Sequence, residues 1–231
     1  MIKIKNMYFL ADIGGTKSRI ALSSELKSFT EPLIFSTPKN FRDFISIAKK
    51  YIKDFSAGSS LKLADAGVHG TLEPSKSFLL KAQHLKEWEG VFLKNELEAA
   101  LSVRCYLEND TAMVGLGESV FGAAKNYKIN GYITISTGVG GVKIVNNAIE
   151  PHYTGFEPGH QILIIDKKLY TLENLVSGSA LKAQYNKQPS EIADIAVWEK
   201  VHNYLAIGLA NITMCWSPEA LVLGGVLVNG N

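Results

Sequence analysis

The sequence predicts an α/β fold whose sheet is largely parallel, and two observations support that prediction. Strand-like and helix-like segments alternate along the 231 residues, as is typical of α/β proteins. In addition, two similar stretches each set a glycine-rich turn between two apolar runs. The first turn is Gly14-Gly15-Thr16, and the second extends from Thr137 to Gly141.

Composition narrows the class of protein. With 46% hydrophobic residues the chain can form a packed core, as one large domain or two small ones. The net charge of +2, without a dense basic run, gives no indication of a nucleic-acid partner. Cys105 and Cys215 lie far apart, as expected for reduced thiols. No apolar run reaches the ~18 residues of a membrane span, and Met7 to Ala11 is too short for a secretion signal, so we expect a soluble, cytoplasmic protein without a membrane partner.

After the first glycine turn, the first half of the chain is predicted to contain a strand, a helix, a strand, a helix and a strand. Asn40 is placed to cap the first helix, where apolar residues recur at helical spacing. Leu, Glu and Ala, which favour helices, dominate the second helix. A long polar connection precedes that second helix. The predicted ranges are Pro32 to Phe35, Phe41 to Phe55, Leu61 to Val68, Lys94 to Leu101 and Arg104 to Leu107.

The second half is predicted to contain a helix, the second glycine hairpin, two further helices and a last strand. Pro218 follows the longest helix and marks its end. The predicted ranges are Thr111 to Ala124, Tyr132 to Ser136, Val142 to Val145, Thr171 to Tyr185 (interrupted at Ser177-Gly178-Ser179), Ile192 to Trp216 and Leu221 to Leu223.

The first glycine turn is a candidate anion-binding loop. Tight hairpin turns favour glycine because they need positive φ, and glycines leave backbone N–H groups accessible. A concave turn of such groups binds phosphate. Asp12 ends the preceding strand, where its carboxylate can hold magnesium directly or through water. The alternative is an ordinary hairpin with a polar turn.

Five short segments together resemble, in order, the motifs of the ROK family of sugar kinases and related repressors. Within that family the fold is the actin-like one of ATPases and hexokinases. The resemblance implies a two-lobed, actin-like (ribonuclease H-like) α/β fold with a cleft between the lobes. We place the two domains at 1–110 and 111–231, the second being incomplete at its C-terminus. The segments are Asp12 to Lys17, Leu107 to Asp110, Thr134 to Gly141, Gly155 to His160 and Leu221 to Gly225.

The resemblance implies where ATP and magnesium bind. Asp12 would organise the magnesium ion. The phosphates would be held by two turns, and adenosine would approach a pair of glycines after the last strand. The residues so assigned are Gly14, Gly15, Thr16 and Lys17, then Thr137 and Gly138, and finally Gly224 and Gly225.

By the same resemblance Asp110 is the general base that accepts a proton from the sugar hydroxyl. Taken alone, Asp110 could instead cap the helix that follows it. The implied sugar ligands are Asn109, Glu157, His160 and Glu173, whose polar groups suit adjacent hydroxyls. A half-buried, structurally satisfied histidine is the alternative for His160.

The chain departs from the family pattern at two places. Many members follow the histidine with a cysteine-rich zinc loop, whereas this chain has Asp166 to Tyr170 there. Because no cysteine lies between Cys105 and Cys215, we expect no zinc site and no metal-ligand role for His160. Val68-His69-Gly70 stands where members more often have a Pro-Gly pair.

The function expected from the resemblance is ATP-dependent phosphorylation of a hexose or N-acetylhexosamine, at the 6-hydroxyl. Glucose, mannose, N-acetylglucosamine and N-acetylmannosamine fit these residues equally well. A homodimer is compatible with the family. Two alternatives stay open, a sugar-sensing regulator and a catalytically weak sugar-binding protein. Because only seven residues precede the first predicted strand, we expect no DNA-binding domain there, which favours the kinase over the regulator.

Overall fold

The computed structural model describes residues 6–56 and 58–229, which form two compact units. The first unit ends at Met113 and also includes Tyr153–Gly155. The second consists of Val114–His152 and the chain from Phe156 onward. The predicted domains, 1–110 and 111–231, are each continuous in sequence. In the structure the first unit is discontinuous, because it includes Tyr153–Gly155.

A five-stranded sheet in the order β3-β2-β1-β4-β7 organises the first unit. The first three strands form an antiparallel meander, and β1, β4 and β7 pair in parallel. The parallel strands require crossover connections, which here contain helices. The strands are β1 (Met7–Ile13), β2 (Lys17–Ser23), β3 (Leu33–Ser36), β4 (Leu61–Val68) and β7 (Cys105–Asn109).

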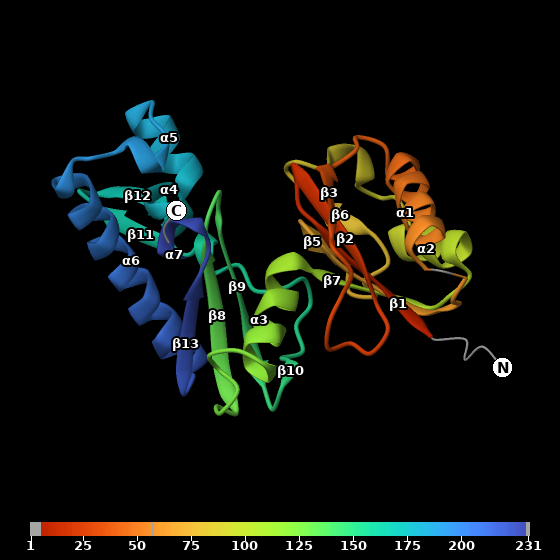
Figure 1. Ribbon diagram of the computed structural model, residues 1–231. Helices are drawn as coiled ribbons and strands as arrows, with labels where there is room; N and C mark the ends of the chain where they lie inside the picture. Colours follow the sequence, from red (N-terminus) through yellow and green to blue (C-terminus); the bar gives the residue numbers. More distant parts are fainter. Residues whose placement is uncertain (1–5, 57, 230–231) are drawn as a thin grey trace. The chain divides into compact units, whose positions relative to one another are not determined.

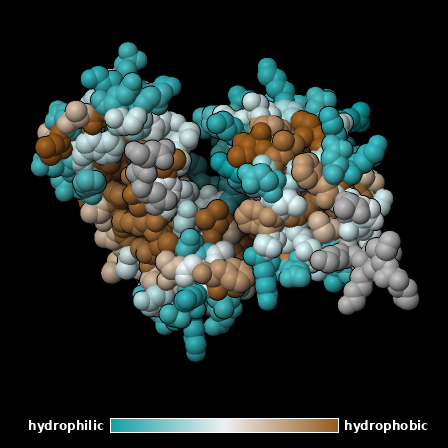
Figure 2. Space-filling model, in the orientation of Figure 1, coloured by the Kyte–Doolittle hydropathy of each residue, from teal (hydrophilic) through white to brown (hydrophobic). Residues whose placement is uncertain are grey.

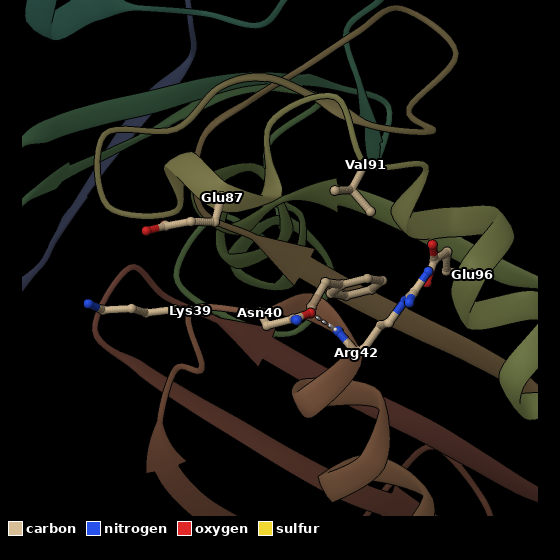
Figure 3. Close-up of a pocket in the computed structure, with 7 residues that line it drawn as sticks. Lys39, Asn40, Arg42, Glu87, Val91 and Glu96 are labelled. Carbon is tan, nitrogen blue, oxygen red and sulfur yellow. Dashed lines mark hydrogen bonds between the residues drawn. The ribbon is translucent and has the colours of Figure 1, made fainter.

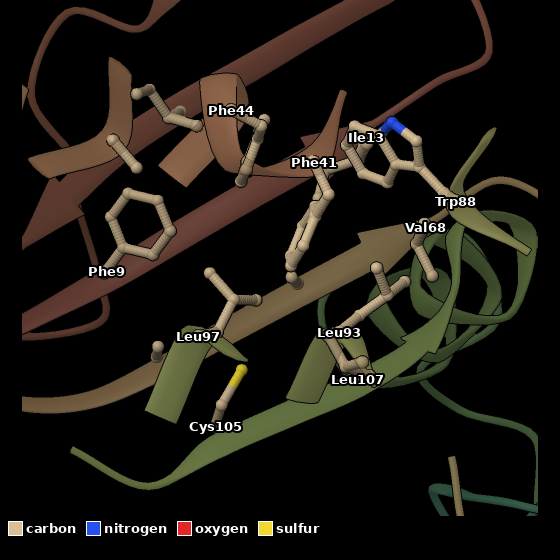
Figure 4. Close-up of a cluster of buried hydrophobic side chains, with 14 of the residues drawn as sticks. Phe9, Ile13, Phe41, Phe44, Val68, Trp88, Leu93, Leu97, Cys105 and Leu107 are labelled. Atoms are coloured by element: carbon tan, nitrogen blue, oxygen red, sulfur yellow. The ribbon is translucent and has the colours of Figure 1, made fainter. Parts of the chain in front are cut away.

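Helices α1 (Phe41–Phe55) and α2 (Leu93–Leu101) lie on the same side of this sheet (Figure 1). Asn40 caps α1 as predicted, because its side chain accepts from the Arg42 N–H. The core between helices and sheet is rich in aromatic residues (Figure 4). The ring of Trp88 contacts two phenylalanine rings of α1, and its Nε1 donates to the carbonyls of Pro38 and Lys39. The fully buried tryptophan is therefore both packed and hydrogen-bonded.

The connection between β4 and α2, predicted to lack regular structure, contains three short elements. Strands β5 (Thr71–Leu72) and β6 (Leu79–Lys81) form a small antiparallel sheet, and η1 (Lys86–Trp88) is one turn of 3₁₀ helix. Leu79, fully buried, attaches this segment to the core. Strands this short leave no periodic pattern in a sequence.

A four-stranded sheet in the order β10-β9-β8-β13 organises the second unit. Strands β8 and β13 are parallel, whereas β9 is antiparallel to β8 and to β10. Asn146 and Asn147 both have positive φ (52° and 59°), as a two-residue hairpin turn between β9 and β10 requires. The strands are β8 (Ile129–Ile135), β9 (Val139–Val145), β10 (Ala148–Ile149) and β13 (Ala220–Gly224).

Helices cover both faces of the second sheet (Figure 1). On one face, α3 (Asp110–Val120) is so close that a methyl group at Gly115 would meet Val142. On the other, α6 packs with the shorter helices around a core that includes Ile133 and Leu172. Figure 2 shows that hydrophobic surface gathers over α6 and β13. The remaining helices are α4 (Leu172–Val176), α5 (Gly178–Tyr185), α6 (Ile195–Trp216), α7 (Val226–Asn229), η2 (Pro158–His160) and η3 (Pro189–Glu191).

The segment around Asp166 to Tyr170, for which no element was predicted from the sequence, belongs to a β-hairpin. Strands β11 (Ile162–Ile165) and β12 (Lys168–Thr171) are joined by Asp166 and Lys167, whose φ values are 49° and 64°. Turns with positive φ at both positions usually contain glycine or asparagine, so Asp-Lys gave only a weak turn signal.

Most predicted boundaries differ from the structure by a few residues, and two of these differences lie at predicted site residues. The helix predicted over Thr111 to Ala124 begins at Asp110 and ends at Val120. The turn predicted from Thr137 to Gly141 is shorter, because Gly140 and Gly141 belong to β9. No helix in the described ranges 6–56 and 58–229 is long and apolar enough to cross a membrane.

We expect the two cysteines to differ in reactivity. Burial, together with the negative charges of Asp65 and Glu98, raises the pKa of Cys105 to about 12. Because the thiolate is the reactive form, Cys105 should be inert at pH 8, whereas the exposed Cys215 should react. A colorimetric thiol reagent should count one fast thiol in the folded protein and two in denaturant. Cys215→Ser should remove the fast reaction, and fast labelling of that variant would contradict the burial of Cys105.

Candidate functional site

Three parallel strands of the first unit end at one edge of its sheet, and most of its predicted site residues lie there. The register pairs Asp12 with Gly67 and Val68 with Asn109. The carboxyl ends of β1, β4 and β7 therefore meet, which is where ligands bind in parallel α/β sheets. This arrangement brings Asp12 and the first glycine turn to the same edge as Asp110.

The first glycine turn joins β1 to β2 and is closed by a hydrogen bond of 3.0 Å from the Gly14 N–H to the Lys17 carbonyl. The expectation of positive φ at its glycines is wrong, because neither Gly14 nor Gly15 has it. Glycine is needed at 15 for close packing, since a Cβ there would lie 2.5 Å from the Cβ of His84. In the described part of the chain, the N–H groups of Gly15 and Thr16 have no protein acceptor. They are available to an anion.

A hollow of about 400 Å³ adjoins this turn. Gly15 and His84 line it together with two lysines, Lys39 and Lys86, and one acid, Glu87, so its net charge is positive. A neighbouring hollow at the start of α1, shown in Figure 3, is lined by none of the predicted site residues. The hollow beside Gly15 is therefore the one that suits a phosphate.

Asp12 is exposed and forms an ion pair across the hairpin. Its Oδ2 accepts from the Arg19 Nη1 at 2.8 Å, and both side chains are 53% exposed. Magnesium in phosphate-transfer sites is usually held by one or two carboxylates together with phosphate oxygens and water. A single exposed carboxylate beside a phosphate-sized turn fits such an ion.

Asn109 and Asp110 end β7 and begin α3. The Asn109 side chain caps the helix, because its Oδ1 accepts from the Ala112 N–H at 3.1 Å. Its Nδ2 also donates to the Gly70 carbonyl at 3.1 Å. The alternative that Asp110 is the cap is therefore wrong. Asp110 Oδ1 accepts from the Thr111 N–H at 2.7 Å, and the carboxyl group is 24% exposed.

Two contacts near Asp110 were not predicted from the sequence. His69, just after β4, has its Nδ1 3.5 Å from Asp110 Oδ2. Glu108, nearly buried, forms an ion pair with Lys76 from the connection after β5. The position of His69 directly after a predicted strand was a usable signal, whereas Lys76 precedes Glu108 by a long stretch that only the fold brings back.

The second glycine turn, between β8 and β9, also exposes backbone donors. The Ser136 N–H closes it by donating to the Gly138 carbonyl at 2.9 Å. Among residues 6–56 and 58–229, no acceptor receives the N–H of Thr137 or Gly138. A Cβ at Gly138 would lie 2.6 Å from the Glu173 carboxylate, so only glycine fits without displacing that group.

Glu173 supports this turn. Its Oε2 accepts from the Val139 N–H at 2.8 Å. The junction of α4 and α5 adds two bonds, from the Gly178 N–H to the Ser136 carbonyl and from the Ser179 N–H to the Thr137 carbonyl, at 2.7 and 3.1 Å. The turn is thus held by the helices behind it while its own two N–H groups stay free.

The last strand brings its glycines to the same turn. Because β13 is parallel to β8, Gly224 and Gly225 lie beside the end of β8, and Gly225 has φ +98°. A side chain at Gly225 would meet the Ile135 carbonyl, and one at Gly224 would meet the Tyr132 hydroxyl. Burial raises the pKa of Tyr132, and the negative charge of Glu118 raises it further. A hydrogen bond with the Thr134 side chain lowers the pKa but does not cancel the increase. The tyrosine therefore stays neutral in the physiological range.

Glu157 precedes η2 and His160 is the last residue of η2, which packs on β9 through Gly159. His160 Nδ1 lies 3.7 Å from Glu157 Oε2, and the two side chains are 61% and 50% exposed. The alternative of a half-buried, satisfied histidine is therefore wrong, because His160 is exposed. Both groups are accessible to a ligand.

The structure thus gathers the predicted residues into two groups, one in each unit. Within the described residues, it shows no group of three or more His, Cys, Asp or Glu side chains arranged to hold a metal ion. The first group contains Asp12, Gly14, Gly15, Thr16, Lys17, Asn109 and Asp110. The second contains Thr137, Gly138, Glu157, His160, Glu173, Gly224 and Gly225.

Comparison with known proteins identifies the relatives of this chain. A family model described as "ROK family" matches residues 8–231. The fructokinase of Lactococcus lactis subsp. cremoris is 27% identical over 94% of this chain and 78% of that protein. The xylose repressor of Bacillus subtilis (strain 168) is 28% identical over 62% of this chain and 43% of the repressor.

Among solved structures, the ROK family glucokinase of Streptomyces griseus, in complex with glucose and AMPPNP, matches with a TM-score of 0.77. It is 20% identical, and the match covers 97% of this chain and 84% of the glucokinase. The predicted α/β, actin-like fold class is confirmed by these similarities.

We expect Gly138 and Glu173 to be energetically coupled. Gly138→Ala should push the Glu173 carboxylate away and break its bond to the Val139 N–H. A hydrogen bond to a charged group contributes about 1.5–3 kcal/mol. Gly138→Ala and Glu173→Ala should each lower the free energy of unfolding, and the double variant should cost clearly less than their sum.

Chemical denaturation of the four proteins measures this coupling. Gly117→Ala is the matched control, because Gly117 lies in α3 with open space around it, and alanine should be neutral or stabilising there. Additive costs at 138 and 173 would show that the carboxylate does not hold the turn.

Proposed function

The chain belongs to the ROK family, and we propose that it is a sugar kinase that transfers the γ-phosphoryl group of ATP to a sugar hydroxyl. The observation that supports this most directly is the turn at Thr137 and Gly138. Its two N–H groups are unpaired, and Glu173 and the α4–α5 junction hold it rigid. A preorganised pair of donors is what binding of charged phosphate oxygens requires.

The other predicted ATP contacts agree with this proposal. In the first unit, Gly14, Gly15, Thr16 and Lys17 form a turn with free N–H groups beside a basic hollow. In the second unit, adenosine would approach Gly224 and Gly225 beside the end of β8. Asp12 would hold magnesium, which when bound neutralises charge on the phosphate oxygens.

Asp110 is the proposed base. As the sugar oxygen bonds to the γ-phosphorus, the bond from that phosphorus to the leaving ADP oxygen breaks and its electron pair stays on ADP. The hydroxyl proton passes to the Asp110 carboxylate. The Thr111 N–H fixes one carboxylate oxygen and leaves lone pairs on both oxygens for this step. Because Asp110 lies between the end of β7 and the start of α3, two regular elements hold its backbone in position.

The sugar would be held by Asn109, Glu157, His160 and Glu173. Glu157 and His160 are exposed, and their side chains contact each other. Asn109 and Glu173 already make structural hydrogen bonds, so each would offer only its remaining capacity. The relatives named fructokinase and glucokinase add fructose to the hexoses and N-acetylhexosamines considered from the sequence, with the 6-hydroxyl as the expected acceptor.

We expect Asp110→Asn to lower kcat by roughly 10²–10⁴, the usual contribution of a positioned base, while sugar affinity changes only a few-fold. A coupled ADP-release assay with a panel of hexoses and N-acetylhexosamines gives kcat, and calorimetry gives affinity. Asp43→Asn on α1 is the matched control and should keep full activity. Unchanged kcat in Asp110→Asn would remove Asp110 from the mechanism.

The second candidate is a catalytically weak sugar-binding or regulatory protein, favoured by the similarity to a xylose repressor. The same assay separates the two. Saturable sugar binding with no sugar-stimulated release of ADP, for any sugar of the panel, would support the regulator and overturn the kinase proposal.

A further inference from the structure

The backbone fixes His69 beside the carboxylate of Asp110. His69 follows the last residue of β4, and its N–H donates to the Ile13 carbonyl at 2.8 Å. The next residue, Gly70, is held by the Asn109 side chain. With the chain anchored on both sides, the His69 Nδ1 lies 3.5 Å from Asp110 Oδ2, and the side chains are 37% and 24% exposed.

Two titratable side chains lie near His69, the carboxylate of Asp110 and the imidazole of His84. The ring of His84 lies 5.7 Å from the His69 ring, tilted by 30°. The neighbouring acids of the same sheet edge are already paired with cations, Glu108 with Lys76 and Asp12 with Arg19. The carboxylate of Asp110 lies 3.5 Å from His69 Nδ1, close enough for the charges of the two groups to interact.

Protonation of this histidine changes what Asp110 can do. An unperturbed imidazole titrates at about pH 6.5, far above an unperturbed aspartate. Imidazolium at 3.5 Å attracts the carboxylate and stabilises its unprotonated form, which makes the carboxylate a poorer proton acceptor. Neutral imidazole leaves the carboxylate free to accept a proton.

We propose that His69 is a positioning residue that acts through Asp110 and sets the pH below which Asp110 stops accepting the proton of the sugar hydroxyl. This inference rests on the proposed kinase function. It assigns a role to a histidine that stands where the family more often has a Pro-Gly pair. The proton still passes from the sugar oxygen to Asp110, and His69 changes only the readiness of the carboxylate to take it.

The first test is the pH profile of kcat for the wild type and His69→Gln. The wild-type kcat should fall about tenfold per pH unit below the pH at which His69 takes up its proton, a midpoint that the NMR titration described next measures. In His69→Gln this acid limb should move down by at least about one pH unit. His202→Gln, on the exposed surface of α6, is the matched control and should keep the wild-type profile. Equal midpoints in wild type and His69→Gln would overturn the proposal.

The second test needs no turnover. NMR titration of the histidine ring carbons, with His69→Gln to assign the signal, gives the midpoint of His69. Asp110→Asn should lower that midpoint by about half a unit to one unit, because the opposite charge is gone. The signal of His202 should not move. An unchanged His69 midpoint would show that the two groups are not coupled, whatever the protein phosphorylates.

The two tests separate failure of this inference from failure of the proposed function. If no sugar is phosphorylated but the His69 midpoint depends on Asp110, the pair is established and the kinase proposal falls. If sugar is phosphorylated and the midpoint is independent of Asp110, the kinase stands and the role of His69 is refuted.

Discussion

Parallel pairing of β4 with β1 on one side and β7 on the other is the constraint on which the first group of site residues depends. The backbone register ends all three strands at one edge, so Asp12, His69 and Asp110 lie at the same edge although they are far apart in the sequence, and His69 contacts Asp110. In the second unit, the parallel pairing of β8 with β13 does the same for the turn at Thr137 and the glycines at 224 and 225. The positions of these strand ends and turns therefore follow from strand direction and register before any side chain is considered.

The hydrophobic cores hold these strand ends in place. Trp88, Phe9 and Phe44 are fully buried in the core of the first unit, and burial of aromatic rings contributes most per residue to such a core. The carboxylates of the proposed site, Asp12 and Asp110, stay partly exposed, since burying an unpaired charge would cost more free energy than packing contributes. Apolar side chains fix the backbone, and the polar side chains at its edge keep their contact with solvent and ligands.

Several residues predicted as ligands also carry the local structure. Asn109 caps α3 and holds the loop after β4, and Glu173 holds the turn at Gly138. A side-chain amide or carboxylate has several hydrogen-bonding positions, so one group can anchor the backbone and still face a ligand. Such double use ties binding to rigidity, because the residue that would touch the sugar also fixes the element next to it.

The sequence by itself determined the alternation of strands and helices, the cap at Asn40, the two glycine turns and the motif order, because each depends on neighbours within a few residues. Only the tertiary structure shows why residue 15 must be glycine. The reason is its close contact with His84 and not a positive φ. The tertiary structure also placed Glu173 on the second turn and formed the hairpin around Asp166 and Lys167. These depend on contacts between segments distant in the chain, whose distances are fixed only when the sheets and cores have formed.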